Sequence, residues 1–193
     1  MAFAVGDGNH SLASAKACYE ALKEAHPGED LSSHPARYAL VELENIHDEA
    51  QKLEPIHRII THCNPEALLE DLKKDLCTEE AEDPAFTIKW SSQGQGGELY
   101  LRGKNGQLAV GILQNWLDAY LKEHPADIDY IHDDDALMKL AEAEGSIGFL
   151  LPPIEKWQLF RGVMADGSLP RKTFSMGHSR EKRYYLEGRK IRL

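Results

Sequence analysis

The chain begins with a glycine-rich turn that carries several polar side chains, residues 5–11 (VGDGNHS). Two glycines allow the backbone to turn tightly and to approach a ligand closely, and apolar residues at helical spacing follow at once. The start of that helix offers unpaired N–H groups and the positive end of the helix dipole, which together suit an anion. The predicted phosphate cradle consists of Gly6, Gly8, Asn9 and Ser11.

Two side chains of this turn are candidates for catalysis. Asp7 could hold Mg²⁺ or accept the proton of a substrate hydroxyl, and His10 adds a further side-chain donor. The alternative is an Asx-type turn in which Asn9 or Ser11 caps the helix. The stretch matches neither a Walker A loop, which needs GxxxxGK[ST], nor a full dinucleotide-binding fingerprint.

A second stretch, residues 54–58 (EPIHR), ends in the adjacent pair His57 and Arg58. If the pair lies in a strand, the two side chains point to opposite faces. An imidazole transfers protons near neutral pH, and a guanidinium pairs with phosphate or carboxylate groups. We therefore predict that His57 is catalytic and that Arg58 binds phosphate, with a structural salt bridge as the alternative.

A third stretch, residues 169–177 (LPRKTFSMG), combines two cations, two hydroxyls and a glycine. This composition predicts an oxyanion-binding loop in which Arg171, Lys172 and Thr173 contact phosphate. A surface β-turn explains the same residues equally well.

The nine histidines provide no recognisable metal site, because the chain has no HExxH motif and no pair of histidines four residues apart. His132 and the aspartates at 133–135 could ligate a cation, but a run of Asp before a helix typically caps it. No metal-ligand set is predicted. The cofactors left open are Mg²⁺ and a nucleotide.

The elements that must position these residues alternate between strands and helices. Strands are predicted at residues 3–5, 38–43, 86–90, 98–102, 107–110, 128–131 and 147–151, and residues 56–60 form a further apolar stretch. Helices are predicted over residues 12–22, from residue 65, over residues 113–121, after residues 133–135 and over residues 157–164. We therefore predict an α/β (mixed α+β) fold, with flanking helices on a mixed sheet and an antiparallel meander over residues 86–110.

Composition indicates an ordinary globular chain of 193 residues, with 42% hydrophobic and 28% charged residues. We expect one domain over residues 1–193. No apolar run approaches the length of a membrane helix, so no membrane association is predicted. The three cysteines form no CxxC motif, which favours reduced thiols and a cytoplasmic location.

The net charge of −10 is unevenly distributed along the chain. Residues 171–193 hold eight Lys or Arg against two Glu, so the other 170 residues carry a net charge of −16. An acidic body repels nucleic-acid backbones, which argues against a nucleic-acid partner. The basic tail either faces a small anion or is a solvated terminus.

The chain resembles the bacterial and archaeal family catalogued as domain of unknown function 1015. The resemblance rests on FAVGDGNHSLASAKACYE, HPARYALVELENIHDEAQKLEPIHRII and GSIGFLLPPIEKWQLFRGVMADGSLPRKTFSMG. Many family members carry DGHHR where this chain has DGNHS, so Ser11 replaces an arginine, and the other two basic stretches could supply the missing charge. The resemblance implies that family proteins are about twice this length. We therefore expect this chain to be a C-terminal half, with the N-terminal half of the same protein as a partner.

The DGxH element before a helix is also similar to the phosphate-binding motif of the ParB and sulfiredoxin superfamily. That group includes nucleotide-binding partition proteins and free-serine kinases. The similarity implies a protein that binds a nucleotide or a phosphate metabolite, as in a small-molecule kinase. The alternatives are a non-catalytic, nucleotide-gated regulatory module that dimerises, and a structural remnant without a ligand. Whether the chain is an enzyme stays open.

Overall fold

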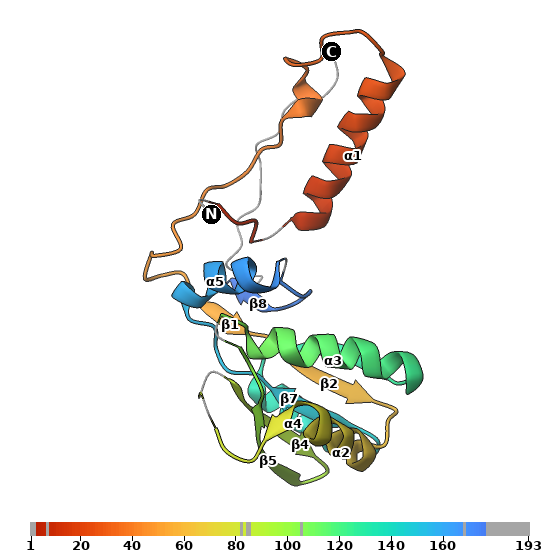
Figure 1. The fold of residues 1–193 in the computed structure, drawn as a ribbon, viewed down its shortest axis with the longest axis vertical. Coiled ribbons are helices and arrows are strands. Elements are labelled where there is room, and N and C mark those ends of the chain that lie inside the picture. The colour runs from red at the N-terminus through yellow and green to blue at the C-terminus, as the bar shows by residue number, and fades with distance from the viewer. Residues whose placement is uncertain are drawn as a thin grey trace. The chain divides into compact units, whose positions relative to one another are not determined.

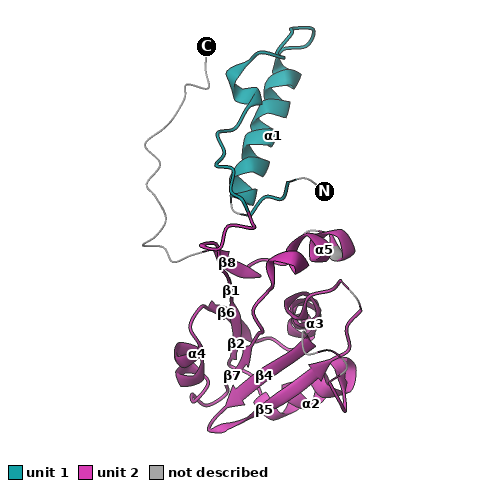
Figure 2. Ribbon diagram, turned by 90° about the vertical axis from the view of Figure 1, so that its left-hand side faces the viewer, with its two compact units in different colours: residues 1–45, 180–193 teal, residues 46–179 magenta. Residues whose placement is uncertain are grey.

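A computed structural model describes residues 3–6, 8–81, 83, 86–104, 106–167 and 169–176. The chain divides into two compact units (Figure 2). Unit 1 comprises residues 1–45 and 180–193, and unit 2 comprises residues 46–179. The two units are described separately below. No helix among the described residues is long and apolar enough to cross a membrane.

Unit 1 is built around a long helix, α1 (Asn9–Ala25), followed by a short 3-10 helix, η1 (Pro35–Arg37). The helix predicted from the apolar spacing is thus confirmed. The Tyr19 hydroxyl donates a hydrogen bond of 3.0 Å to the carbonyl oxygen of Leu31, which ties the helix to the returning chain. No residue of α1 is buried.

The strand predicted over residues 38–43 is wrong, because this segment belongs to neither sheet. Its apolar side chains are exposed, with Leu40 at 64% and Leu43 at 76% of their full surface. Residues 3–5, also predicted as a strand, likewise lie outside both sheets. The propensity of such residues for strands depends on packing against neighbouring strands. The described part of unit 1 contains no strand that could provide such packing.

Unit 2 contains two antiparallel sheets (Figure 1). The six-stranded sheet has the order β3-β5-β4-β7-β2-β6, and β1 pairs with β8 in a small second sheet. The strands are β1 (Leu53–Pro55), β2 (His57–Thr61), β3 (Cys77–Thr78), β4 (Thr87–Ser92), β5 (Gln95–Leu101), β6 (Asp127–Ile131), β7 (Ile147–Leu150) and β8 (Phe174–Met176). The predicted α/β class is confirmed, and every described strand pair is antiparallel.

Helices cover both faces of the six-stranded sheet, with α4 on one side and α2 and α3 on the other (Figure 2). The helices of unit 2 are α2 (Pro65–Leu76), α3 (Ala109–Glu123), α4 (Asp134–Leu140) and α5 (Lys156–Asp166). The Asp133 carboxylate accepts a hydrogen bond from the Ala136 N–H, so this aspartate caps α4 as its position predicted. Glu155 and Gln158 form a capping box at α5.

The predicted meander is a hairpin followed by a helix. Gln93 and Gly94, both with positive φ, form a two-residue turn between β4 and β5, in place of the longer flexible connection expected from SSQGQGG. The strand predicted over residues 107–110 is also wrong, because α3 already begins at Ala109. Ala109 and Val110 are buried on the same helix as Leu113, so they extend its apolar face by one turn.

Strand β2 divides its side chains between the two faces of the sheet. Ile60 belongs to the main core with residues of α2 and α3, whereas Ile59 packs with Leu137 of α4 in a smaller cluster. Because of this alternation, the neighbours of His57 and those of Arg58 lie on opposite faces of the sheet. Trp157 at the start of α5 is 60% exposed and is not part of the core.

Candidate functional site

The predicted site residues fall into two groups, one in each unit. Residues 6–11 belong to unit 1, and the basic residues at 57–58 and 171–173 belong to unit 2. Asp7 lies outside the described residues.

The start of α1 in unit 1 is shaped by Gly8. Gly8 is the N-cap of α1 and adopts the left-handed conformation (φ 81°, ψ 15°), which favours glycine. Its carbonyl accepts the Leu12 N–H at 2.9 Å, the first bond of the helix. No side chain caps α1, so neither Asn9 nor Ser11 plays the capping role that was the alternative.

The side chains of the first turn are available to a ligand. Asn9, His10 and Ser11 are all exposed, and the first turn contains no acidic residue. A first turn without an acidic side chain adds no negative charge that would compete with an external anion for the positive end of the helix dipole. Gly6 is also exposed.

His57 is enclosed within unit 2 and has a partner at each ring nitrogen. Its side chain is 2% exposed, Nδ1 accepts the Leu151 N–H at 3.0 Å, and Nε2 lies 2.7 Å from Oδ1 of Asp134. Because Nδ1 acts as an acceptor, the proton belongs on Nε2, which donates it to Asp134. The imidazole therefore joins β2, the chain after β7 and the first turn of α4. Its predicted catalytic role stays a prediction.

Arg58 is fully buried on the opposite face of β2, as the alternation predicted. Nε donates to Oε1 of Gln114 at 3.0 Å, and Nη1 donates to the carbonyls of Ile56 and of Lys172, the latter at 2.9 Å. Nη2 donates to the carbonyl of Arg171 at 3.2 Å. All four bonds go to uncharged oxygens, so the guanidinium joins β2 to α3 and to the turn before β8.

The turn before β8 presents its two cations to solvent. Arg171 and Lys172 are exposed, and Nε of Arg171 donates to the Tyr130 hydroxyl at 2.7 Å. Thr173 is buried, and its hydroxyl donates to the carbonyl of Pro170 at 2.6 Å, which closes the turn. The structure thus brings all four predicted phosphate ligands of unit 2 into one place.

Tyr130 lies between the two guanidiniums. The Cζ atom of Arg58 is 5.0 Å and that of Arg171 is 5.7 Å from the centre of its ring, within cation–π range. Asp118 on α3 completes the group, with Oδ1 3.7 Å from Nη2 of Arg171. Sequence reasoning missed Tyr130, Asp118 and Gln114. Of these three, only Gln114 is conspicuous in the sequence, because it is a polar residue next to Leu113 on the apolar side of a helix.

The electrostatics separate the two arginines. Desolvation by burial lowers the pKa of Arg58 to about 10, while the charge of Asp118 acts in the opposite direction. The hydrogen bond to Tyr130 raises the pKa of Arg171, which is exposed. Arg58 is therefore a desolvated cation in the interior, and Arg171 is a solvent-exposed cation at the surface.

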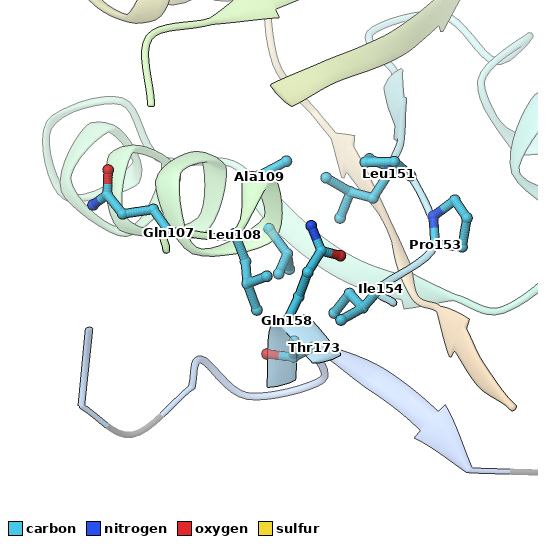
Figure 3. Close-up of a pocket in the computed structure, with 10 residues that line it drawn as sticks. Gln107, Leu108, Ala109, Leu151, Pro153, Ile154, Gln158 and Thr173 are labelled. Carbon is cyan, nitrogen blue, oxygen red and sulfur yellow. The ribbon is translucent and has the colours of Figure 1, made fainter. Parts of the chain in front are cut away.

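A small pocket lies close to this turn, at the start of α3 (Figure 3). Leu108, Ile154, Gln158 and Thr173 are among the residues that line it. Its space for water-sized molecules is about 20 Å³, enough for about one water. A nucleotide does not fit there, so a phosphate-bearing ligand at this turn would bind at the surface.

Metal chemistry finds no support in the described part of the chain. No group of three or more His, Cys, Asp or Glu side chains there could hold a metal ion. Cys18, Cys63 and Cys77 are free thiols. Burial raises the pKa of the Cys63 and Cys77 thiols, so neither is an activated nucleophile.

Comparison with known proteins gives one match. A family model described as "Protein of unknown function (DUF1015)" matches residues 1–189, so the chain belongs to this family. No curated protein and no solved structure matches the chain.

Proposed function

We propose that this member of the family binds the phosphate of a nucleotide or a phosphate metabolite at the start of α1. The observation that carries the proposal is the left-handed Gly8 cap, followed by an exposed first turn with no acidic residue and no side-chain cap. Backbone N–H groups at such a helix start bind phosphate oxygens, and the helix dipole adds to the attraction. The Asn9, His10 and Ser11 side chains would supply further donors.

The catalytic form of the proposal is a small-molecule kinase of the ParB and sulfiredoxin type. A substrate hydroxyl would attack the terminal phosphorus of the nucleotide, the bond from that phosphorus to the leaving phosphate oxygen would break, and the hydroxyl proton would pass to Asp7 or His10. Asp7 is also the residue that would hold Mg²⁺, which would neutralise charge on the transferred group. Positioning and electrostatic stabilisation of this kind account for most of phosphoryl transfer.

A second candidate is a regulatory module that binds a nucleotide without turning it over. The exposure of Asn9, His10 and Ser11 favours it, because phosphoryl transfer proceeds best where water is excluded. This version expects nucleotide-dependent stabilisation or dimerisation and no phosphorylated product.

The test is a thermal-shift screen of the chain with ATP, ADP, CTP and GTP, with and without Mg²⁺. Ligand at about 100 times its Kd adds about 2.7 kcal/mol of stability, which corresponds to a rise of several degrees in Tm. His10→Ala should abolish the shift. His26→Ala is the matched control, because His26 lies at the other end of α1.

Product analysis of the same mixtures separates the two candidates. A shift with a phosphorylated product supports the kinase, and a shift without product supports the regulatory module. No shift with any nucleotide, or a shift equally large in His10→Ala, would refute a phosphate site at α1.

A further inference from the structure

The turn at residues 170–173 is held by Arg58 through two consecutive carbonyl groups. The carbonyl oxygens of Arg171 and Lys172 accept from Nη2 and Nη1 of this buried side chain at 3.2 and 2.9 Å. In a trans peptide the C=O and the following N–H point in opposite directions. The Lys172 N–H is therefore turned away from the buried guanidinium, whereas the N–H of the buried Thr173 closes the turn toward the Pro170 carbonyl.

The backbone of this turn is strained. Lys172 has a φ of 55°, in the left-handed region that a residue with a side chain rarely adopts. The bonds from Arg58 and the Thr173 hydroxyl bond to Pro170 keep it there. Strain of this kind is retained chiefly at functional sites. An outward N–H group beside a left-handed residue is a suitable donor for a bound anion.

The charges around the turn favour a doubly charged anion. Three cations, Arg58, Arg171 and Lys172, gather there, and the carboxylate that acts on both guanidiniums is Asp118. Three positive charges and one negative charge leave a net charge of +2. A phosphate group carries about two negative charges near neutral pH.

We propose that the turn at residues 170–173 is an oxyanion site of unit 2 that takes a phosphate group. Its ligands are the Arg171 guanidinium, the Lys172 ammonium and the outward N–H group of Lys172. Arg58 is a positioning residue that fixes the turn and does not touch the anion. The site goes beyond the phosphate cradle at α1, because all its residues lie in unit 2.

The experiment titrates the full chain with inorganic phosphate and follows amide shifts by NMR. The Lys172 amide should move most. Arg171→Ala should weaken binding about tenfold or more, as expected for the loss of a charge-assisted hydrogen bond. Raising the ionic strength should also weaken binding, because the ligand cations are exposed.

Lys172→Gly is the decisive variant, because it removes the cation and relieves the backbone strain at once. It should fold at least as well as the wild type and still bind phosphate about tenfold more weakly. Gln93→Gly is the matched control, since Gln93 also has a positive φ (48°) but lies in the β4–β5 turn. It should leave phosphate binding unchanged.

Each result decides between the two sites. Unchanged affinity in both Arg171→Ala and Lys172→Gly, or the absence of an amide shift at Lys172 in the wild type, would overturn the proposal. Phosphate binding that is lost only in His10→Ala would assign the ion to α1, so this proposal would fail while the proposed function stood. The reverse pattern would support the site in unit 2 alone.

Discussion

Replacing Arg58 by methionine tests whether the buried guanidinium holds unit 2 together. The change removes four hydrogen bonds and leaves the oxygens of Ile56, Gln114, Arg171 and Lys172 without these donors. Hydrogen bonds from charged donors contribute about 1.5–3 kcal/mol each, so four would give an upper limit of about 6–12 kcal/mol. Such contributions are not additive within one network.

An opposing effect reduces this figure. Burial lowers the pKa of Arg58 to about 10, so desolvating the cation costs the folded protein about 3 kcal/mol. Methionine fills much of the same space without that cost. Because bonds within one network contribute less than their sum, we expect a net loss of about 3–5 kcal/mol in the free energy of unfolding.

Urea unfolding followed by tryptophan fluorescence measures this loss, because Trp90, Trp116 and Trp157 all lie in unit 2. With a denaturant slope of about 2 kcal/mol/M, the midpoint should fall by about 2 M. Arg161→Met is the matched control: Arg161 is exposed on α5, and its replacement should change stability by less than about 0.5 kcal/mol. A loss below about 1 kcal/mol in Arg58→Met would refute the reasoning, because desolvation would then cancel the hydrogen bonds.

Three further predictions follow from the contacts described above. His57→Ala should lower the free energy of unfolding by about 2 kcal/mol, and His57→Asn by less, because an amide oxygen can replace Nδ1 as acceptor; urea midpoints compare the two. Gly8→Ala should cost about 1–2 kcal/mol through its left-handed φ alone, since an added Cβ meets nothing within 4 Å, and faster hydrogen exchange of the α1 amides would show it. Burial raises the folded-state pKa of the Cys63 and Cys77 thiols above 9.0, so the unfolded state loses those protons first and stability should fall as pH rises above 9. Urea midpoints at pH 8 and 10 test this, and the double alanine variant should show a smaller fall.

The sequence predicted elements well where a segment meets its partners nearby in the chain, and poorly elsewhere. The Asp133 cap is a local feature, and it is found where it was expected. Residues 38–43 read as a strand because their side chains suit one, but a strand needs a paired neighbour. The strand prediction for residues 107–110 was wrong for a different reason. β-Branched and apolar residues also extend a helix when the helix face that carries them is buried.

The candidate site shows the same division at the level of single side chains. Adjacent His57 and Arg58 were correctly expected on opposite faces, since that follows from strand geometry alone. Their partners, Asp134 and Gln114, are 77 and 56 residues away, and no local pattern indicates them. Burial distinguishes Arg58 from Arg171, although the sequence predicted the same phosphate-binding role for both. Arg58 spends its donors on carbonyls of the protein, whereas Arg171 keeps most of its guanidinium exposed.

The two arginines therefore differ in how many N–H donors they can offer to a ligand. A basic side chain can bind phosphate only through N–H donors that are not already bonded within the protein. Arg58 has used Nε, both contacts of Nη1 and one of Nη2, so its loss should weaken phosphate binding only through the position of the Arg171 and Lys172 carbonyls. Arg58→Lys, which keeps the charge but cannot replace the fork of donors, should therefore bind phosphate as weakly as Arg58→Met. Affinity in Arg58→Lys equal to the wild type would show that charge alone matters and that the geometry of the turn does not.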